Sequence, residues 1–215
     1  ILKSNDKKVL IGLPVAYHSL KNLNRKSRLT WKSHIVWTYP RARKLFDLNK
    51  IYYNAHITRP YNNFEDKSDS ARYFLKLKKI WKNRDIVLFE GEKSRLGVGN
   101  DLFSATKSLY RVLCPARNAF DQYETIFCEA LRHDKAKLIL IALGSTATIL
   151  AYDLSANGYQ ALDIGNIDIE YEWYLRGATN KIKIPGKYTH GALGGNEVED
   201  VNDQLYESQI IARIL

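Results

Sequence analysis

Methionine is absent from the 215 residues of this chain, and cysteine occurs only at Cys114 and Cys128. Two cysteines at this spacing fit neither a disulfide framework nor a zinc site, so we expect a reducing, cytoplasmic setting. A peripheral position at the inner face of the membrane is compatible with this expectation. The longest wholly apolar run, 138–143, is far too short to cross a bilayer, and residues 1–10 lack the apolar core of a secretion signal. A chain that begins with isoleucine and has no methionine is expected to be part of a longer translation product.

Acidic residues are scarce in the first part of the chain. Residues 1–84 hold 20 Lys and Arg against 5 Asp and Glu, whereas residues 85–215 hold 13 against 18. Such asymmetry is typical of proteins that bind nucleic acid, an anionic membrane or a phosphorylated ligand, and it also occurs on solvated, lysine-rich surfaces. No nucleic-acid-binding motif accompanies the charge, so we expect no nucleic acid partner. The length and an apolar fraction of 45% predict one domain with a sizeable core.

Apolar runs and amphipathic segments alternate from residue 85 onward. Strands are predicted at 86–89, 110–113, 138–143 and 160–164, with helices at 119–131 and 146–156. This alternation is typical of an α/β protein with a Rossmann-like, doubly wound, mostly parallel sheet and helices on both faces. Strands are also predicted at 9–13 and 51–57, and helices within 28–48, broken or kinked by Pro40, and at 68–81, capped by Ser68 or Asp69. Residues 186–203 are predicted to form a long surface loop.

A charged, glycine-bearing loop follows the strand at 86–89. Gly91, Gly97 and Gly99 permit sharp turns or a close approach to a ligand, and Lys93 and Arg95 lie between them. Ligands of open α/β sheets bind beyond the carboxyl ends of the strands, where N–H groups and two cations suit a diphosphate. The loop matches neither the dinucleotide fingerprint nor a P-loop, so a plain surface loop is the alternative.

A second turn, Gly144-Ser145-Thr146, follows the most apolar strand and opens a helix. Its free N–H groups suit an anion, although Ser145 or Thr146 acting as a helix cap is the commoner use of such a turn.

Residues 163–173 form the densest acidic cluster. As a strand, residues 167–173 would present Asp168, Glu170 and Glu172 on one face; as a helix, which we favour because a crossover helix is due here, they would make Asp168 and Glu172 neighbours. Asp168 and Glu170 are candidates for holding magnesium or manganese, or for acting as a general base. The alternative is complementation of the helix dipole.

Several motifs, in chain order, resemble one family. They are Arg59-Pro60-Tyr61, the segments 90–102 (EGEKSRLGVGNDL), 114–120 (CPARNAF) and 143–148 (LGSTAT), the acidic cluster 163–173, and residues 186–188 and 206–211. These motifs resemble the bacterial GT-D glycosyltransferases, a family long catalogued as a domain of unknown function. The resemblance runs across nearly the whole chain.

The resemblance implies a transferase that takes a hexose, glucose first, from a UDP-sugar with the help of a divalent metal, Mn²⁺ or Mg²⁺. The acceptor would be a glycan on a glycoprotein or a surface polysaccharide, and a homo-oligomer is an open expectation. Asp168 and Glu170 are the candidates within this chain for catalysis and for the metal. Residues of the shared motifs are predicted to bind the nucleotide sugar: Arg59, Glu92, Lys93, Ser94, Arg95, Gly97, Gly99, Asn100, Asp101, Asn118, Gly144, Thr146, Gly165 and Lys187.

The chain departs from the family pattern in three places. The early Arg-Phe-Gly-Asp-Gly-Glu segment, with its paired carboxylates, has no counterpart here, and we expect it upstream of Ile1. His190-Gly191 replaces the usual Asn-Glu, and Ser145 and Asn166 replace Pro and His. Two alternatives therefore stay open: a non-catalytic nucleotide-sugar-binding or scaffold part of a glycosylation system, and a basic nucleic-acid-binding module.

Overall fold

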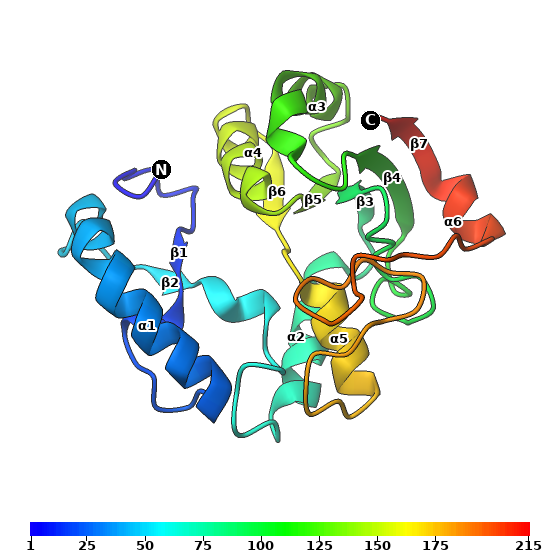
Figure 1. Cartoon of the computed structure of the whole chain (residues 1–215). Coiled ribbons are helices and arrows are strands. Elements are labelled where there is room, and N and C mark those ends of the chain that lie inside the picture. The colour runs from blue at the N-terminus through cyan, green and yellow to red at the C-terminus, as the bar shows by residue number, and fades with distance from the viewer.

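A five-stranded parallel sheet forms the centre of the computed structural model, which describes residues 1–215 (Figure 1). The strands lie in the order β6-β5-β3-β4-β7, and every neighbouring pair is parallel. This arrangement confirms the predicted α/β class and the parallel sheet. The strands are β3 (Asp85–Gly91), β4 (Ser108–Cys114), β5 (Leu138–Ala142), β6 (Gln160–Asp163) and β7 (Ile210–Arg213).

Helices cover both faces of the sheet, as predicted. Alternate residues of β3 point to opposite faces, so Val87 packs beneath α3 (Tyr123–Leu131) and α4 (Ser145–Ala156), whereas Leu88 packs beneath α2 (Ser70–Trp81) and α5 (Ile167–Leu175). Both residues are fully buried. Burial on two faces explains why this strand reads as a continuous apolar run in the sequence.

The chain reverses its path across the sheet after β4. β3 leads to β4 on one side, and the crossover through the 3₁₀ helix Ala119–Gln122 and α3 carries the chain past β3 to β5 on the other side. The loops that leave the carboxyl ends of β3 and β5 therefore diverge. In doubly wound sheets this divergence creates the crevice in which ligands bind.

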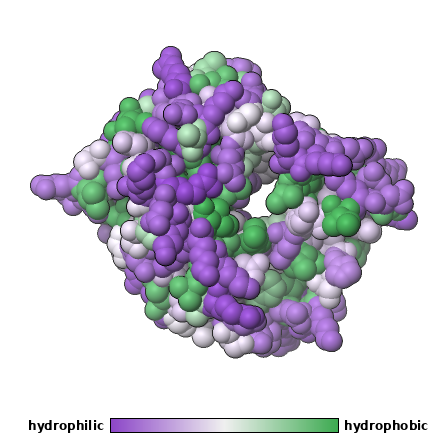
Figure 2. All heavy atoms as spheres, turned by 180° about the vertical axis from the view of Figure 1, so that it is seen from behind, coloured by the Kyte–Doolittle hydropathy of each residue, from purple (hydrophilic) through white to green (hydrophobic).

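The residues before α2 form a segment beside the sheet. It contains α1 (Arg25–Ala42), the two-residue strands β1 (Gly12–Leu13) and β2 (Tyr53–Asn54), which pair in parallel, and 3₁₀ helices at Val15–Tyr17, Arg43–Leu45 and Ala55–Thr58. Figure 1 shows this segment to one side of the sheet, and the space-filling view from behind is hollowed between it and the rest of the molecule (Figure 2). No helix of the structure combines the length and the apolarity that crossing a membrane requires.

Predictions for this segment need correction. The strands expected at 9–13 and 51–57 are each two residues long. β2 ends at Asn54, because the side chain of Asn54 accepts a hydrogen bond from the His56 N–H (2.8 Å) and starts a 3₁₀ helix. Helix α1 continues through Pro40, which lies in its last turn, and ends at Ala42. Neither Ser68 nor Asp69 caps α2 with its side chain.

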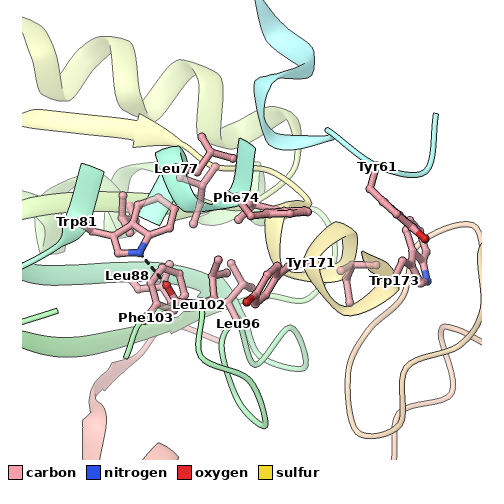
Figure 3. Packing of buried hydrophobic residues seen from close by; sticks show 14 of the residues in the cluster. Tyr61, Phe74, Leu77, Trp81, Leu88, Leu96, Leu102, Phe103, Tyr171 and Trp173 are labelled. Carbon is pink, nitrogen blue, oxygen red and sulfur yellow. Dashed lines mark hydrogen bonds between the residues drawn. The ribbon is translucent and has the colours of Figure 1, made fainter. Parts of the chain in front are cut away.

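Aromatic side chains of α2 fill the core between the sheet and α5 (Figure 3). The ring centroids of Phe74 and Tyr171 are 4.8 Å apart, and those of Trp81 and Phe103 are 5.4 Å apart. The Trp81 Nε1–H donates to the carbonyl oxygen of Leu102 at 2.8 Å. These contacts anchor the far end of the glycine loop to α2, so the core sets where this loop lies.

The C-terminal part crosses the carboxyl edge of the sheet before joining it. Residues 176–203 contain no helix or strand, which confirms the loop predicted at 186–203, but α6 (Gln204–Gln209) and β7 were not predicted. The buried Arg111 of β4 holds them in place. Its Nη1 donates to Glu90 at 2.6 Å, its Nε donates to Gln209 at 2.8 Å, and its guanidinium lies 4.9 Å from the Tyr206 ring centroid.

Candidate active site

A pocket of about 770 Å³ opens at the carboxyl ends of β3, β4, β5 and β6, where the topology predicts a ligand site. Its wall is made by residues at and after the ends of these strands. Ala55, Thr58 and Arg59 of the N-terminal segment and Tyr188 and His190 of the C-terminal loop complete it. Seven of the predicted nucleotide-sugar or catalytic residues line it: Arg59, Ser94, Asn118, Gly144, Thr146, Gly165 and Asp168.

The N-terminus of α4 faces this pocket. Gly144 precedes the helix with φ +58° and ψ −137°, a conformation that favours glycine, and no side chain caps the helix. Capping by Ser145 or Thr146, the commoner use of such a turn, is therefore not observed. Uncapped N–H groups at the positive end of a twelve-residue helix attract an anion.

Asn118 adds a strained backbone to the wall of this pocket. Its φ of 52° and ψ of 38° are left-handed, and its side chain does not cap the 3₁₀ helix that follows. Asparagine adopts this conformation more readily than most residues, and such outliers gather at ligand sites. The side chain is exposed in the pocket wall, where it is available to a ligand.

Asp163, the last residue of β6, supplies a carboxylate to the pocket. It accepts hydrogen bonds from the Thr148 hydroxyl (2.8 Å) and from the Gly165 N–H (3.0 Å). Desolvation in the pocket wall raises the pKa of Asp163, although both hydrogen bonds and the charge of Arg59 act in the other direction. Asp163 was not among the predicted site residues, although its place at the carboxyl end of a predicted strand was a usable signal.

Asp168 lies in the first turn of α5 and is 1% exposed. Its Oδ1 accepts from the Gly97 N–H and from Asn100 Nδ2, both at 2.8 Å, and its Oδ2 accepts from Lys187 Nζ at 2.7 Å. Glu172 shares two of these partners, Asn100 (2.7 Å) and Lys187 (3.1 Å). The helical alternative for residues 167–173, with Asp168 and Glu172 as neighbours, is therefore confirmed. This network ties the glycine loop and the C-terminal loop to α5.

Glu170 points to a different set of partners. Its Oε2 accepts from the backbone N–H groups of Tyr61 (3.1 Å) and Asn62 (2.8 Å), and the side chain is 1% exposed. Burial raises the pKa of Glu170, against the effect of these two donors. The contact holds the Arg59-Pro60-Tyr61 turn against α5 and so sets the position of Arg59 in the pocket wall.

The partners of the two carboxylates do not suit a shared metal ion. Asp168 is satisfied by Lys187 and the glycine loop, whereas Glu170 is satisfied by backbone donors of the N-terminal segment. No group of three or more His, Cys, Asp or Glu side chains in the structure could hold a metal. The divalent metal implied by the family resemblance stays a prediction, and these two residues alone do not fit it.

The other predicted donor-site residues lie outside the pocket wall. The Lys93 carbonyl accepts from the Tyr188 N–H at 2.8 Å, and Asp101 accepts from Lys78 (2.7 Å) and from the Tyr171 hydroxyl (2.5 Å). Gly97, Asn100 and Lys187 contact Asp168, and Glu92 and Gly99 belong to the same loop. Polar wall residues that were not among the predicted site residues include Asp163, Thr58, Arg117, Tyr188 and His190.

Arg95 is 8% exposed, and its guanidinium faces the C-terminal loop. Its Nη1 donates to the carbonyl oxygens of Gly186 (2.7 Å) and Glu199 (2.8 Å). We therefore expect Arg95→Met to lower the free energy of unfolding by about 1–3 kcal/mol, because charged hydrogen bonds to two backbone carbonyls are lost, and to leave UDP affinity unchanged.

Urea denaturation and calorimetric titration with UDP test this expectation. Arg72→Met, which removes an exposed ion pair with Asp69, is the control and should change the stability by less than about 1 kcal/mol. A loss of UDP affinity without a loss of stability would restore the predicted contact between Arg95 and the diphosphate.

Comparisons with known proteins agree with this architecture. The family model for the glycosyltransferase GT-D fold matches residues 1–192. A solved structure described as a new glycosyltransferase (DUF1792) from Streptococcus sanguinis is 38% identical, with a TM-score of 0.91, and the match covers 96% of this chain and 77% of that one. Another, described as the highly conserved domain of unknown function 1792 with a distinct glycosyltransferase fold, is 40% identical, with a TM-score of 0.92 and coverage of 99% and 76%.

Curated relatives are longer proteins. The probable glycosyl transferase Gly of Streptococcus gordonii is 40% identical over 218 residues, which are 99% of this chain and 31% of the relative. Glycosyltransferase GlyD of Streptococcus pneumoniae serotype 4 is 43% identical over 185 residues, which are 86% of this chain and 23% of the relative. This chain thus spans less than a third of either relative. On its family match and its fold, the chain belongs to the GT-D glycosyltransferases.

Proposed function

We propose that this chain carries the donor site of a glycosyltransferase that takes a hexose, with glucose as the first candidate, from a UDP-sugar and passes it to a glycan acceptor. The acceptor would be part of a glycoprotein or of a surface polysaccharide. The observation that carries the proposal is the uncapped N-terminus of α4, which opens into a pocket of about 770 Å³ between diverging strands. Membership of the GT-D family supports the reaction class.

The diphosphate would bind at the N-terminus of α4. Ser145 and Thr146 line the pocket there, and Arg59 and Arg117 bring two guanidinium groups to its wall. Positive charge at this place offsets the charge that builds on the leaving UDP as the glycosidic bond breaks. Lys93 lies on the loop between β3 and β4, outside the wall, so its predicted contact with the diphosphate stays a proposal.

Asp163 would act as the general base. The acceptor hydroxyl oxygen forms a bond with the anomeric carbon, the bond from that carbon to the diphosphate oxygen breaks, and UDP leaves with its electron pair. Asp163 takes the hydroxyl proton. A carboxylate with a raised pKa inside a ligand pocket suits this role. Asp168 and Glu170, the earlier candidates for catalysis, would instead hold the glycine loop and the Arg59 turn.

We expect Gly144→Ala to weaken UDP binding about tenfold or more, an energy of about 1.4 kcal/mol. A side chain strains the positive φ of this residue and turns the α4 N–H groups away from the diphosphate. Isothermal titration calorimetry with UDP and UDP-glucose, with and without Mn²⁺, measures the effect.

Gly177→Ala is the matched control, because Gly177 has a similar φ of 59° at the end of α5, outside the pocket wall. Both variants should lose about 1–3 kcal/mol of stability to backbone strain, and only Gly144→Ala should lose UDP affinity. Absence of UDP binding by the unaltered chain, or equal losses of affinity in the two variants, would contradict the proposed donor site.

A further inference from the structure

A second cavity, of about 810 Å³, lies between the N-terminal segment and the end of α5. Its wall combines the first turn of α1, the residues around Asn62 and the loop 179–181. It shares Ala55 and Arg59 with the donor pocket, so the two cavities adjoin at the Arg59 turn. The hollow visible from behind lies between the same two parts of the molecule (Figure 2).

The wall of this second cavity carries an excess of positive charge. Arg25, Lys26, Arg59, Lys67 and Lys181 line it, and none of them forms an ion pair; Glu65 is the single carboxylate in the wall. Burial and the charges of Arg59 and Lys26 lower the pKa of Lys181, although the nearby Glu170 acts in the other direction. A lysine whose pKa is lowered by burial and by neighbouring cations is stabilised in its charged form when an anion binds beside it.

The first turn of α1 adds to the electrostatic repulsion among these cations when no anion is bound. The positive end of a helix favours acidic residues, but α1 begins with Arg25 and Lys26 and has no acidic residue in its first turn. Its N-cap, Asn24, accepts from the Ser27 N–H at 2.8 Å. Cationic side chains therefore project into the cavity from the helix end that already repels them. An anion in the cavity would relieve this repulsion.

Two buried polar atoms in the wall have no hydrogen-bond partner. His56 and Asn62 are each 7% exposed, and His56 Nδ1 and Asn62 Nδ2 are unsatisfied. Leaving such atoms without partners costs free energy unless a ligand supplies one. Trp31, half-buried beside His56 with ring centroids 5.5 Å apart, adds an aromatic surface to the same wall. The wall thus combines cations without ion pairs, unsatisfied polar atoms and an aromatic ring.

We propose that the second cavity binds the acceptor, and that this acceptor is a saccharide bearing a phosphate or a carboxylate group. The inference rests on the proposed glycosyltransferase function, which supplies the saccharide. The oxyanion would lie among Arg25, Lys26 and Lys181, with a sugar ring against Trp31, and the reacting hydroxyl would point past Arg59 towards the donor pocket.

Isothermal titration calorimetry with glucose 6-phosphate, glucuronate and glucose tests this site, with and without saturating UDP. We expect one or both of the anionic sugars to bind, and to keep binding when UDP is present, while glucose binds at least about tenfold more weakly, a difference of about 1.4 kcal/mol. Comparison of the affinities for glucose 6-phosphate and glucuronate shows whether the acceptor bears a phosphate or a carboxylate group.

The double variant Lys26→Gln/Lys181→Gln should lower the affinity for the anionic sugar about tenfold and leave UDP affinity unchanged. Lys32→Gln, an exposed lysine of α1 outside the cavity wall, is the control and should bind as the unaltered chain does. The double variant Lys26→Arg/Lys181→Arg keeps the charge at both positions and should still bind the anionic sugar. Retained binding would show that the loss in the glutamine variant comes from the missing charge and not from misfolding.

Three results would overturn the inference. The first is that glucose binds as tightly as the anionic sugars, or that neither glucose 6-phosphate nor glucuronate binds to a chain that binds UDP. The second is displacement of glucose 6-phosphate by UDP, which would assign its phosphate to the donor pocket. The third is a single-stranded oligonucleotide that binds more tightly than the sugars and depends on the same lysines. A chain that binds an anionic sugar but no UDP would contradict the donor site and not this cavity.

Discussion

Lys187→Met is expected to lower the free energy of unfolding by about 3–5 kcal/mol at neutral pH, because it removes the shared cation of two buried carboxylates. Lys187 is 4% exposed, and its Nζ donates to Asp168 at 2.7 Å and to Glu172 at 3.1 Å. Methionine fills a similar volume, so the effect measures the lost charge rather than a cavity. Urea denaturation followed by tryptophan fluorescence gives the value.

Lys183→Met is the matched control for this change. Lys183 lies four residues earlier, in an ion pair of 3.7 Å with the exposed Glu199. Exposed pairs contribute about 0–1 kcal/mol, so the control should change the stability little. Equal stability of the two variants would mean that the Asp168 network does not hold the C-terminal loop to α5.

The effect of Lys187→Met should depend on pH. Burial alone would raise the pKa of Glu172, but Lys187, Asn100 and Arg176 together hold it below its usual value. A lowered pKa contributes stability that is present above the pKa of the unfolded chain and is lost as pH falls through the folded value. The difference in stability between the unaltered chain and Lys187→Met should therefore shrink as the pH falls below the ordinary glutamate pKa.

Asp163→Asn is expected to lower kcat for hexose transfer by about 100-fold or more, since a general base contributes a factor of this order. UDP affinity should change little, because the proposed diphosphate site at α4 does not use this carboxylate. The amide oxygen can still accept from the Gly165 N–H, and the amide NH2 can donate to the Thr148 hydroxyl, which then acts as acceptor, so the local turn is preserved. Release of UDP from UDP-glucose in the presence of a glycan acceptor gives kcat, and calorimetry gives the affinity.

Asp134→Asn is a control of the same kind. Asp134 accepts from the Ala136 N–H at 2.8 Å in an exposed turn, as Asp163 does from Gly165, but it precedes β5 and lies at the end of the sheet away from the pocket. Asp134→Asn should leave kcat unchanged.

The kcat of the unaltered chain should depend on pH. Because desolvation raises the pKa of Asp163, the fall of kcat at acid pH should be centred above the ordinary aspartate pKa and be absent in Asp163→Asn. Unchanged kcat in Asp163→Asn would remove this residue from the reaction and leave Asp121 and Asp168 as the remaining carboxylates of the pocket wall.

Some of the site follows from local sequence. Gly144 and Asp163 each lie at the carboxyl end of a predicted strand, and parallel strands bring such ends to one edge of the sheet. The turn at Gly144 follows a strand and opens a helix, as the apolar run before it predicted. Asp163 was not predicted as a site residue because the carboxylates are denser at 168–172. Those three carboxylates are buried and accept hydrogen bonds from donors inside the protein.

Partner choice could not be read from the chain, because the partners lie far apart in sequence. Glu170 accepts from residues more than a hundred positions earlier, and Arg95 donates to carbonyls about as far downstream. Separations of this length cannot be inferred from the periodicity of a helix or a strand, which relates only residues a few positions apart. The same limit applies to the second cavity, whose cations come from the start of α1, the Arg59 turn and the loop after α5.

The sequence by itself determined the α/β class, the central strands and the turns at their carboxyl ends, because apolar periodicity and glycine placement act over a few residues. Only the tertiary structure decided that β7 completes the sheet, that α5 buries its carboxylates against Lys187 and Asn62, and that Arg95 holds a loop. A buried charge needs a partner, and which partner it finds depends on how distant segments pack.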